Sequence, residues 1–420
     1  QTEITGRFTQ QEASDLAGVL KAGKLPAPSD IIEEAVVGPE LGEESIESGL
    51  SSFLIALGVV LIYMIFYYAQ AGVVANGALI ANLFFVLGVL ASLRATLTLP
   101  GIAGIVLTIG MSVDANVLIY ERIREEIRAG KGLKLAVADG YKNAYSSILD
   151  ANITTLLTGI ILATFGTGPI QGFATTLIIG ILTSLFSAIF ITRLLFEWRL
   201  GQKAKIAFGT NATNNILQNP KFEFVKGRKK FYIISGIILL VGLGSLFTRG
   251  LNSGVDFTGG RSYIVRFDKP VEVTEISEAL GKKFVSENGT EQPPQVKTFG
   301  SSNQVKIVTK YKIDSKEDGV DGRIEAKLYE GLLPFYQNDI SESEFITELT
   351  SQKVEPTIAD DIKQAAVWAI LFSLVVIFLY ILIRFRKWQY SVGALLALTH
   401  DVLIVLSLFS IFYGILPFSL

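Results

Sequence analysis

The 420-residue sequence contains no cysteine and only one histidine. The missing cysteines exclude a disulfide, a thiolate nucleophile and a cysteine-based zinc site. The single histidine excludes a metal site built from several histidines. Charged residues make up only 18% of the chain, against roughly 25% in soluble domains, and the net charge is −2. The composition therefore argues against a single soluble enzyme, and it offers no basic field for nucleic acid.

Half of the residues are hydrophobic, and many of them fall in long uninterrupted runs. A helix that crosses a bilayer needs roughly 20 apolar residues, and a soluble helix of that length would need a polar face. We predict a polytopic α-helical membrane protein with eight spans, at residues 51–69, 74–93, 100–120, 145–165, 171–196, 231–248, 362–384 and 389–413. The fourth predicted span contains Asp150 near its start.

Positive charges alternate along this pattern and predict its orientation. The segments after the third, fifth and seventh spans are rich in lysine and arginine, for example Arg384-Phe-Arg-Lys387. The intervening loops are nearly bare, since 94–99 contains Arg94 alone and 166–170 has no charge. We expect the basic segments in the cytoplasm, and the N-terminal segment and the insertion 249–361 outside.

The sequence also repeats itself. Three matched pairs carry the repeat in an almost ungapped register: Val37-Gly-Pro39 with Val354-Glu-Pro356, Leu61-Ile-Tyr63 with Phe378-Leu-Tyr380, and Gly77-Ala-Leu-Ile-Ala81 with Gly393-Ala-Leu-Leu-Ala397. Spans one and two therefore resemble spans seven and eight. Both copies are expected to start outside, which makes the repeats parallel, as in many transporters.

The insertion 249–361 is predicted to be α+β. We expect strands at 262–267, 295–299, 304–309 and 352–355 and helices at 273–284 and 321–333, an order typical of ferredoxin-like domains. A helix at Thr9–Lys21 and a strand at Ile31–Val37 repeat the end of this pattern. We therefore expect residues 1–50 to be the remnant of a sister domain.

Carboxylates inside the spans are the main candidates for function, because a charge in hydrocarbon costs at least ~2.5–3.5 kcal/mol. The tripeptide Asp-Ala-Asn occurs twice, as Asp114 with Asn116 and as Asp150 with Asn152. Counting along the helices puts Asp114 and Asp150 ~10–12 Å from the cytoplasmic edge, which allows one common depth. Asp401 follows His400 in the last span, ~20 Å in, where the repeat has Phe85 in the other copy.

We interpret Asp114 and Asp401 as residues that take up and release a cation, with H⁺ the first candidate, because desolvation raises a carboxylate pKa. Asn116 and Asn152 are expected to donate hydrogen bonds to a neighbouring carboxylate. The alternative is a structural role, in which these polar side chains hold the helices together through hydrogen bonds. For Asp150 this alternative is favoured. For His400 two roles are equally compatible with the sequence, a proton relay and helix packing.

The glycine-rich segments do not indicate a nucleotide site. Gly166-Thr-Gly-Pro-Ile-Gln-Gly172 has no Walker lysine and is interpreted as a turn. Val255-Asp-Phe-Thr-Gly-Gly260 is expected to form a tight turn or bulge that joins a helix to the sheet. Transport by this chain would therefore use an ion gradient, at ~2.3 kcal/mol per charge per 100 mV. No cofactor and no metal site is predicted.

Several of these segments resemble a known protein family. Gly110-Met-Ser-Val-Asp-Ala-Asn-Val-Leu-Ile-Tyr-Glu-Arg-Ile-Arg-Glu-Glu126 and Ser147-Ile-Leu-Asp-Ala-Asn-Ile-Thr-Thr155 closely resemble SecD. Val255-Asp-Phe-Thr-Gly-Gly260 and Leu398-Thr-His-Asp-Val-Leu403 resemble SecF. Both in one chain are similar to the fused SecDF proteins of bacteria, whose plan is that of the resistance-nodulation-division (RND) exporters.

The resemblance implies a domain layout. It gives a remnant of a first periplasmic domain, five SecD-like spans, a cytoplasmic linker, a first SecF-like span, a ferredoxin-like periplasmic domain and two further SecF-like spans, at 1–50, 51–198, 199–230, 231–248, 249–361 and 362–420. On the six-plus-six plan of that family, the first span and the last three would be missing from this sequence.

The resemblance also implies a function. SecDF-type proteins associate with the Sec translocon and use the ion-motive force of H⁺ or Na⁺ to help pull unfolded preproteins across the inner membrane. The intramembrane carboxylates of that family map onto Asp114 and Asp401. Membrane lipid is the other expected partner. Two alternatives remain, an RND-type exporter of small molecules or lipids and a membrane scaffold without ion coupling.

Overall fold

A computed structural model describes residues 33–36, 39–95, 98–166, 168–202, 206–210, 212–214, 223–251, 254–286, 289–313, 315 and 319–412. The predicted helix Thr9–Lys21 lies outside the described residues, and so do both ends of the predicted strand Ile31–Val37.

Eight helices in the described part of the chain are long and apolar enough to cross a membrane, which confirms the predicted number. They are α2 (Pro39–Tyr68), α3 (Gln70–Ser92), α4 (Leu99–Arg128), α5 (Leu133–Phe165), α6 (Gly168–Phe186) with its continuation, α8 (Phe224–Thr248), α13 (Pro356–Phe385) and α14 (Trp388–Ile411). A π-helical turn, Ser187–Ile191, joins α6 to α7 (Thr192–Gly201). The fourth prediction was too short, because α5 begins at Leu133 and places Asp150 in mid-helix.

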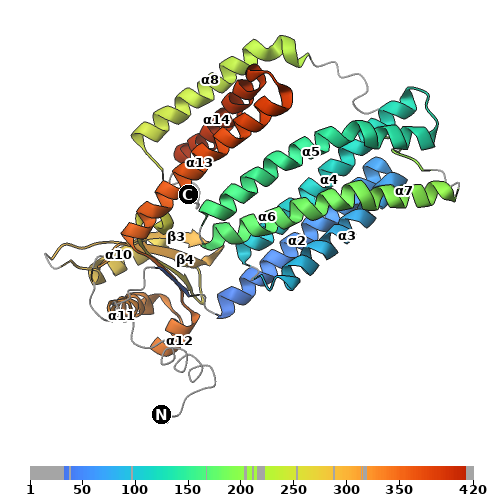
Figure 1. The fold of residues 1–420 in the computed structure, drawn as a ribbon. Coiled ribbons are helices and arrows are strands. Elements are labelled where there is room, and N and C mark those ends of the chain that lie inside the picture. Colours follow the sequence, from blue (N-terminus) through green and yellow to red (C-terminus); the bar gives the residue numbers. More distant parts are fainter. Residues whose placement is uncertain are drawn as a thin grey trace, which may run out of the picture.

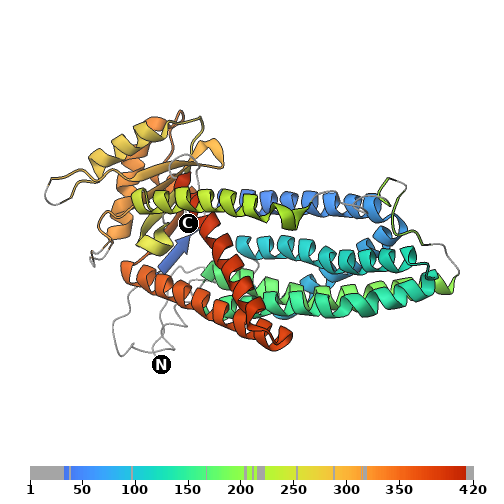
Figure 2. The ribbon, with the colours of Figure 1, turned by 90° about the horizontal axis from the view of Figure 1, so that it is seen from above.

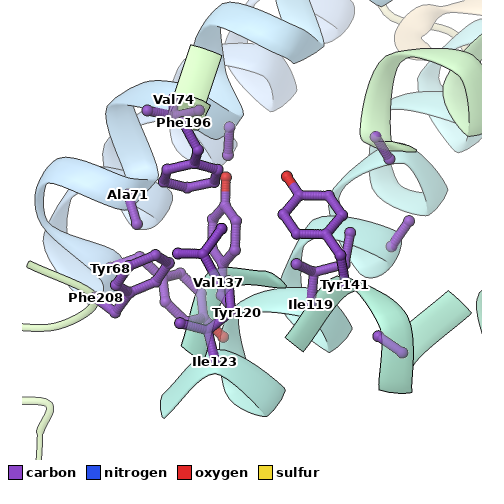
Figure 3. Packing of buried hydrophobic residues seen from close by; sticks show 14 of the residues in the cluster. Tyr68, Ala71, Val74, Ile119, Tyr120, Ile123, Val137, Tyr141, Phe196 and Phe208 are labelled. Carbon is purple, nitrogen blue, oxygen red and sulfur yellow. The ribbon is translucent and has the colours of Figure 1, made fainter. Parts of the chain in front are cut away.

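Helices α2–α7 form a first helix group with a packed interior. In Figure 3, the rings of Tyr120, Phe196 and Phe208 meet at the end of this group, and each pair of centroids lies 5.3–5.6 Å apart. Small residues bring α4 and α6 close together, since a Cβ added at Gly180 would lie 2.1 Å from Thr108 Oγ1. Such close approach is how membrane helices gain packing energy.

Helices α8, α13 and α14 form a second helix group. Ser245 Oγ of α8 and Ser410 Oγ of α14 are 2.9 Å apart, and a Cβ added at Gly242 would meet Ser407. This group meets the first helix group along α13, which lies beside α5 in Figure 1. Few residues of α8, α13 and α14 are buried, only 6% in the apolar stretch of each helix.

The insertion supplies four strands of a five-stranded antiparallel sheet with the order β1-β5-β2-β4-β3. The strands are β1 (Glu33–Val36), β2 (Gly260–Arg266), β3 (Gln295–Phe299), β4 (Ser301–Thr309) and β5 (Thr350–Val354). The helices are α9 (Val255–Thr258), α10 (Val273–Lys283), α11 (Val320–Leu332) and α12 (Glu342–Glu348), and a 3₁₀ turn spans Leu333–Phe335.

The order of β2 to β5 is that of a ferredoxin-like sheet and confirms the predicted α+β class. Apolar residues of β2 and β4, such as Val265 and Ile307, pack with Ile276 of α10 and Leu328 of α11. The strand predicted before span one is also present, as β1. It joins the sheet of the insertion, where it pairs with β5. We call β1 and the described residues of 254–354 the sheet domain.

The repeat is visible in three dimensions. Each copy is a strand followed by a helical hairpin, β1-α2-α3 and β5-α13-α14. In the register of the repeat, Ala35 is equivalent to Gln352, and these two residues face each other where β1 pairs with β5, as a two-fold axis through the strand pair would require. Both hairpins turn at equivalent residues with positive φ, Ala69 at 52° and Arg386 at 57°.

The sheet domain lies at one end of the long helices, and the C-terminal ends of α4 and α7 lie at the other end (Figure 2). The turn between α13 and α14 also faces away from the sheet, because α13 starts directly after β5. Arg128, Arg199 and Arg384, in the last turns of α4, α7 and α13, thus lie at the ends that point away from the sheet, as the predicted orientation requires.

Candidate ion-coupling site

The first candidate residue, Asp150, lies where the two helix groups meet. Its Oδ1 accepts a hydrogen bond from Tyr380 Oη at 2.9 Å and one from Arg384 Nε at 2.7 Å. Arg384 Nη2 also donates to Ser146 Oγ, at 3.3 Å. The side chain of Asp150 is 22% exposed and that of Arg384 is 40% exposed. Asp150 is therefore a half-buried acid whose charge is neutralised by the neighbouring helix group.

Asp114 and Asp150 share one depth in the first helix group. Helices α4 and α5 are in close contact at Ile123 and Gly140, where an added Cβ would lie 3.1 Å from the backbone nitrogen of Ile123. Asp114 is nine residues from Ile123 and Asp150 is ten residues from Gly140, about 14 and 15 Å along the two antiparallel helices. The geometry agrees with the common depth expected from the sequence.

Asp114 itself points away from the interior. It is exposed, and it makes no hydrogen bond or ion pair with the described residues. The expected donation from the asparagines to carboxylates is wrong. Asn116 Nδ2 donates to Ser112 O at 3.2 Å, and Asn152 Nδ2 donates to Ile148 O at 2.8 Å. In each case the carbonyl one turn back on the same helix is the nearer acceptor.

Asp401 and His400 lie in the second helix group. His400 Nδ1 is 2.9 Å from Asp401 Oδ1, and its Nε2 is hydrogen-bonded to Ser235 Oγ of α8. The side chain of Asp401 is 75% exposed, because it projects from a face of α14 that neither α8 nor α13 covers. Asp114 and Asp401 are thus both exposed among the described residues, and neither is buried between the helices described here.

The three carboxylates are not gathered in one place. Asp401 is fourteen residues beyond Lys387, whereas Arg384, the partner of Asp150, lies just before the turn. Asp401 is thus about 15–20 Å from the depth of Asp150 along the helix axes. An apolar cavity of about 370 Å³ lies between the two helix groups. Its lining includes Leu162 and Phe165 of α5, Ala369 of α13, and Leu398 and Val402 of α14. The acidic residues therefore lie at two separate depths, Asp114 and Asp150 at one and Asp401 at the other.

Sequence reasoning missed four residues that complete these contacts. Arg384 was counted only as an orienting charge, Tyr380 only as a marker of the repeat, and Ser146 and Ser235 were not singled out. One signal was present, since Tyr380 and Arg384 are four residues apart and therefore share a helix face. In the described residues, no group of three or more histidine or acidic side chains is placed to hold a metal ion.

Comparisons with known proteins decide the family. The family model described as "Protein export membrane protein SecD/SecF, C-terminal" matches residues 22–201 and 337–419, and a second model, "SecD/SecF GG Motif", matches residues 244–271. The chain belongs to the SecD/SecF family. Residues resembling SecD and residues resembling SecF occur in one chain, as in SecDF.

Similar proteins agree with this assignment. A protein translocase subunit SecD of Rhodothermus marinus is 58% identical over 210 residues, which cover 50% of this chain and 34% of that protein. A protein translocase subunit SecDF of Bacillus subtilis is 31% identical over 428 residues, which cover 97% of this chain and 55% of that protein.

Solved structures agree as well. The crystal structure of SecDF from Thermus thermophilus, a translocon-associated membrane protein, aligns with a TM-score of 0.79 at 34% identity and covers 97% of this chain and 53% of that one. A SecDF structure in a super-membrane-facing form aligns with a TM-score of 0.65.

The chain therefore spans about half the length of the SecDF proteins that it matches. Like other members of the family, it is a multi-pass protein of the bacterial inner membrane. The glycines of the matched motif have a clear local purpose. Gly259 has φ of 66°, and a Cβ there would lie 2.8 Å from Pro356 Cα, so the turn expected at Gly259-Gly260 is confirmed.

Proposed function

We propose that this chain takes part in protein export as an accessory of the Sec translocase, and that it uses an ion gradient to drive late steps of preprotein passage. The observation that carries the proposal is the family match, which includes SecD-like and SecF-like spans in one chain. Acidic residues on three membrane helices add support, because intramembrane carboxylates commonly mark ion pathways. The partners would be the translocon channel and an unfolded preprotein.

Within this proposal, Asp114 and Asp401 carry the cation. Neither has a lysine or arginine partner among the described residues, so each can bind H⁺ or Na⁺ without first displacing one. Their different depths suit a path with two stations better than one shared site. His400 bridges Asp401 and Ser235, and an imidazole so placed can pass a proton between the carboxylate and α8.

Asp150 has a different role in the proposal. Arg384 already neutralises its charge, and Tyr380 fills a further acceptor position on the same oxygen. A cation would have to compete with a guanidinium at 2.7 Å. Asp150 is therefore assigned to holding the helix groups together.

The test is preprotein export into inverted membrane vesicles that contain the translocon and the full-length SecDF-type protein, with an imposed H⁺ or Na⁺ gradient. We expect Asp114→Asn and Asp401→Asn each to remove the stimulation by the gradient while the protein still inserts. Glu278→Gln, an exposed acid of α10, is the matched control. A protonophore and a sodium ionophore, added separately to the unmodified protein, identify the ion.

Unchanged gradient-driven export in the Asp114→Asn, Asp401→Asn double variant would contradict ion coupling and would favour a passive scaffold. Capture of the translocon channel by the full-length protein tests the partner. Failure of that capture, together with gradient-driven efflux of a small solute or lipid, would favour an RND-type exporter instead.

A further inference from the structure

We propose that Arg384 is a positioning residue that fixes α13 against α5, and that α13 thereby links the depth of the carboxylates to the sheet domain. This inference rests on the proposed function, because it assigns a regulatory role to the seam beside Asp114. It concerns the contact between the two helix groups, and it requires no ion to bind at Asp150.

At the C-terminal end of α13, away from the sheet domain, the contact with α5 is made by hydrogen bonds of defined direction. Tyr380 and Arg384 are one helical turn apart, and both donate to the same oxygen, Asp150 Oδ1. A third bond, from Arg384 Nη2 to Ser146 Oγ, reaches α5 one turn earlier. A guanidinium held by two groups on one helix fixes both the rotation and the height of α13. At the other end of the seam the rings of Phe165 and Phe372 make an apolar contact, with centroids 6.0 Å apart.

The outer end of α13 is joined firmly to the sheet domain. Strand β5 ends at Val354 and α13 begins at Pro356, so a single residue separates them. Val354 and Ala359 are buried together with Val255 of α9. The backbone of Gly259 packs directly on Pro356, where there is no room for a side chain. A tilt of α13 must therefore move the sheet with it.

The other copy of the repeat lacks this contact. The residues equivalent to Tyr380 and Arg384 are Tyr63 and Tyr67, which stack on each other with centroids 5.7 Å apart. Tyr63 is 52% exposed, and no described carboxylate lies against it. The ion pair is thus a feature of one hairpin. Because the ion pair occurs on one side only, its formation or release would move the second helix group relative to the first.

The depth of the ion pair gives it access to the proposed ion site. Asp150 lies at the level of Asp114, on the neighbouring helix of a closely packed pair. Release of Arg384 would free α13 at the depth where a cation would bind Asp114, without changing either Asp114 or Asp401. The position of the sheet domain would then respond to events at that depth.

The experiment uses the full-length SecDF-type protein in vesicles with the translocon. The variants are Arg384→Gln, Asp150→Asn, both together, and the exchange Asp150→Arg with Arg384→Asp. Lys387→Gln, an exposed cation three residues further on, is the matched control. This sequence has no cysteine, and any cysteine elsewhere in the full-length protein is replaced first. Single cysteines introduced at Lys142 and Trp388 then carry spin labels that report the distance between α5 and the second helix group.

We expect each single variant to broaden the distance distribution and to lower gradient-stimulated export by roughly 2- to 30-fold, the range for residues that modulate coupling. The double variant should be no worse than either single variant, and the exchange should restore both readouts. Single effects that multiply in the double variant, or a loss equal to that of Lys387→Gln, would overturn the proposal.

The label distances separate this inference from the proposed function. If Asp114→Asn and Asp401→Asn leave gradient-driven export intact but Arg384→Gln still broadens the distribution, ion coupling fails and the positioning role stands. If Arg384→Gln leaves the distances unchanged while the aspartate variants abolish coupling, the positioning role fails alone.

Discussion

The two hairpins of the repeat have the same plan and very different surroundings. In the apolar stretch of α3, 44% of the residues are buried, because α4 and α6 cover this helix. In the apolar stretch of α14, only 6% of the residues are buried. At one pair of equivalent positions, Phe85 of α3 packs against Phe186 with centroids 5.7 Å apart, and Asp401 of α14 is 75% exposed. At this position the first hairpin packs an aromatic ring against α6, and the second presents an acid at its surface.

That difference constrains where Asp401 can work. An ionised carboxylate facing hydrocarbon is costly, at least ~2.5–3.5 kcal/mol on insertion scales. The open face of α14 must therefore meet water, protein or a bound cation in the working molecule. A surface of this kind suits a residue that exchanges an ion during a cycle better than one that only holds helices together.

The largest expected effect contrasts the packing of the two groups. A Cβ at Gly72 of α3 would lie 2.0 Å from the backbone oxygen of Met64, which cannot rotate away. Gly72→Ala should cost about 3 kcal/mol, at the upper end of the usual range for overpacking. Gly244→Ala in α8, where nothing lies within 4 Å, should change stability by under about 1 kcal/mol. Thermal unfolding in detergent measures both, and equal losses would contradict the contrast.

Much of this architecture could be predicted from the sequence. The eight spans follow from apolar length, and four strands of the sheet follow from alternation, because burial of one face leaves a period of two. The common depth of Asp114 and Asp150 follows from counting along helices of known rise. The equivalence of Ala69 and Arg386 at the two hairpin turns follows from the register of the repeat.

The contacts between helices could not be predicted in this way. The pairing of Arg384 with Asp150 depends on how α13 is rotated about its axis and on which helix lies beside it, and neither is encoded in the local pattern. The exposure of Asp114 and Asp401 depends on the same two unknowns. Strand β1 was recognised from its residues, but its place beside β5 depends on a pairing far along the chain.

The second prediction concerns the sheet to which α13 is joined. Arg261 of β2 is 2% exposed and donates to Asp321 Oδ1 at 2.7 Å, and Lys353 of β5 donates to Oδ2 at 2.9 Å. Asp321→Asn should destabilise the sheet domain by about 1.5–3 kcal/mol, the range for hydrogen bonds to charged groups. Glu278→Gln, on the exposed face of α10, should have no measurable effect.

The pH dependence follows from the same contacts. Burial alone would raise the pKa of Asp321, but hydrogen bonds from Lys353 and Arg261 outweigh it and hold the pKa below its ordinary value. The stabilisation is then complete above the pKa of the unfolded chain, about 3.9, and is lost as pH falls through the lower folded pKa. Limited proteolysis of the sheet domain between pH 7 and 3 should show this loss, and Asp321→Asn should flatten that part of the profile. A profile unchanged by the substitution would contradict the assignment.

The third prediction returns to the first helix group. Tyr68 is 2% exposed, and its Oη donates to Glu121 Oε1 at 3.1 Å, which ties α2 to α4. Tyr68→Phe should cost about 1.5 kcal/mol in thermal unfolding, the lower end of the range for hydrogen bonds to charged groups, since it removes one bond to a carboxylate and leaves the ring in place. Tyr63→Phe, on the same helix but 52% exposed, is the control and should be neutral. A neutral Tyr68→Phe would mean that apolar packing alone joins these helices.

The smallest expected effect lies in the second helix group. Ser410 of α14 is fully buried, and its Oγ lies 2.9 Å from Ser245 Oγ of α8. Ser410→Ala should cost about 0.6 kcal/mol, the mean found for hydrogen bonds between membrane helices. Ser407 is equally buried one turn earlier, and its Oγ has no partner among the described residues.

Ser407→Ala is therefore the matched control, and it should be neutral or slightly stabilising, because a buried hydroxyl without a partner keeps its desolvation cost. Thermal unfolding in detergent compares the two. A larger loss for Ser407→Ala than for Ser410→Ala would show that close contact with Gly242, rather than the serine pair, holds α8 against α14. The two helix groups would then depend on the same kind of packing, and their difference would lie only in how much of it each group has.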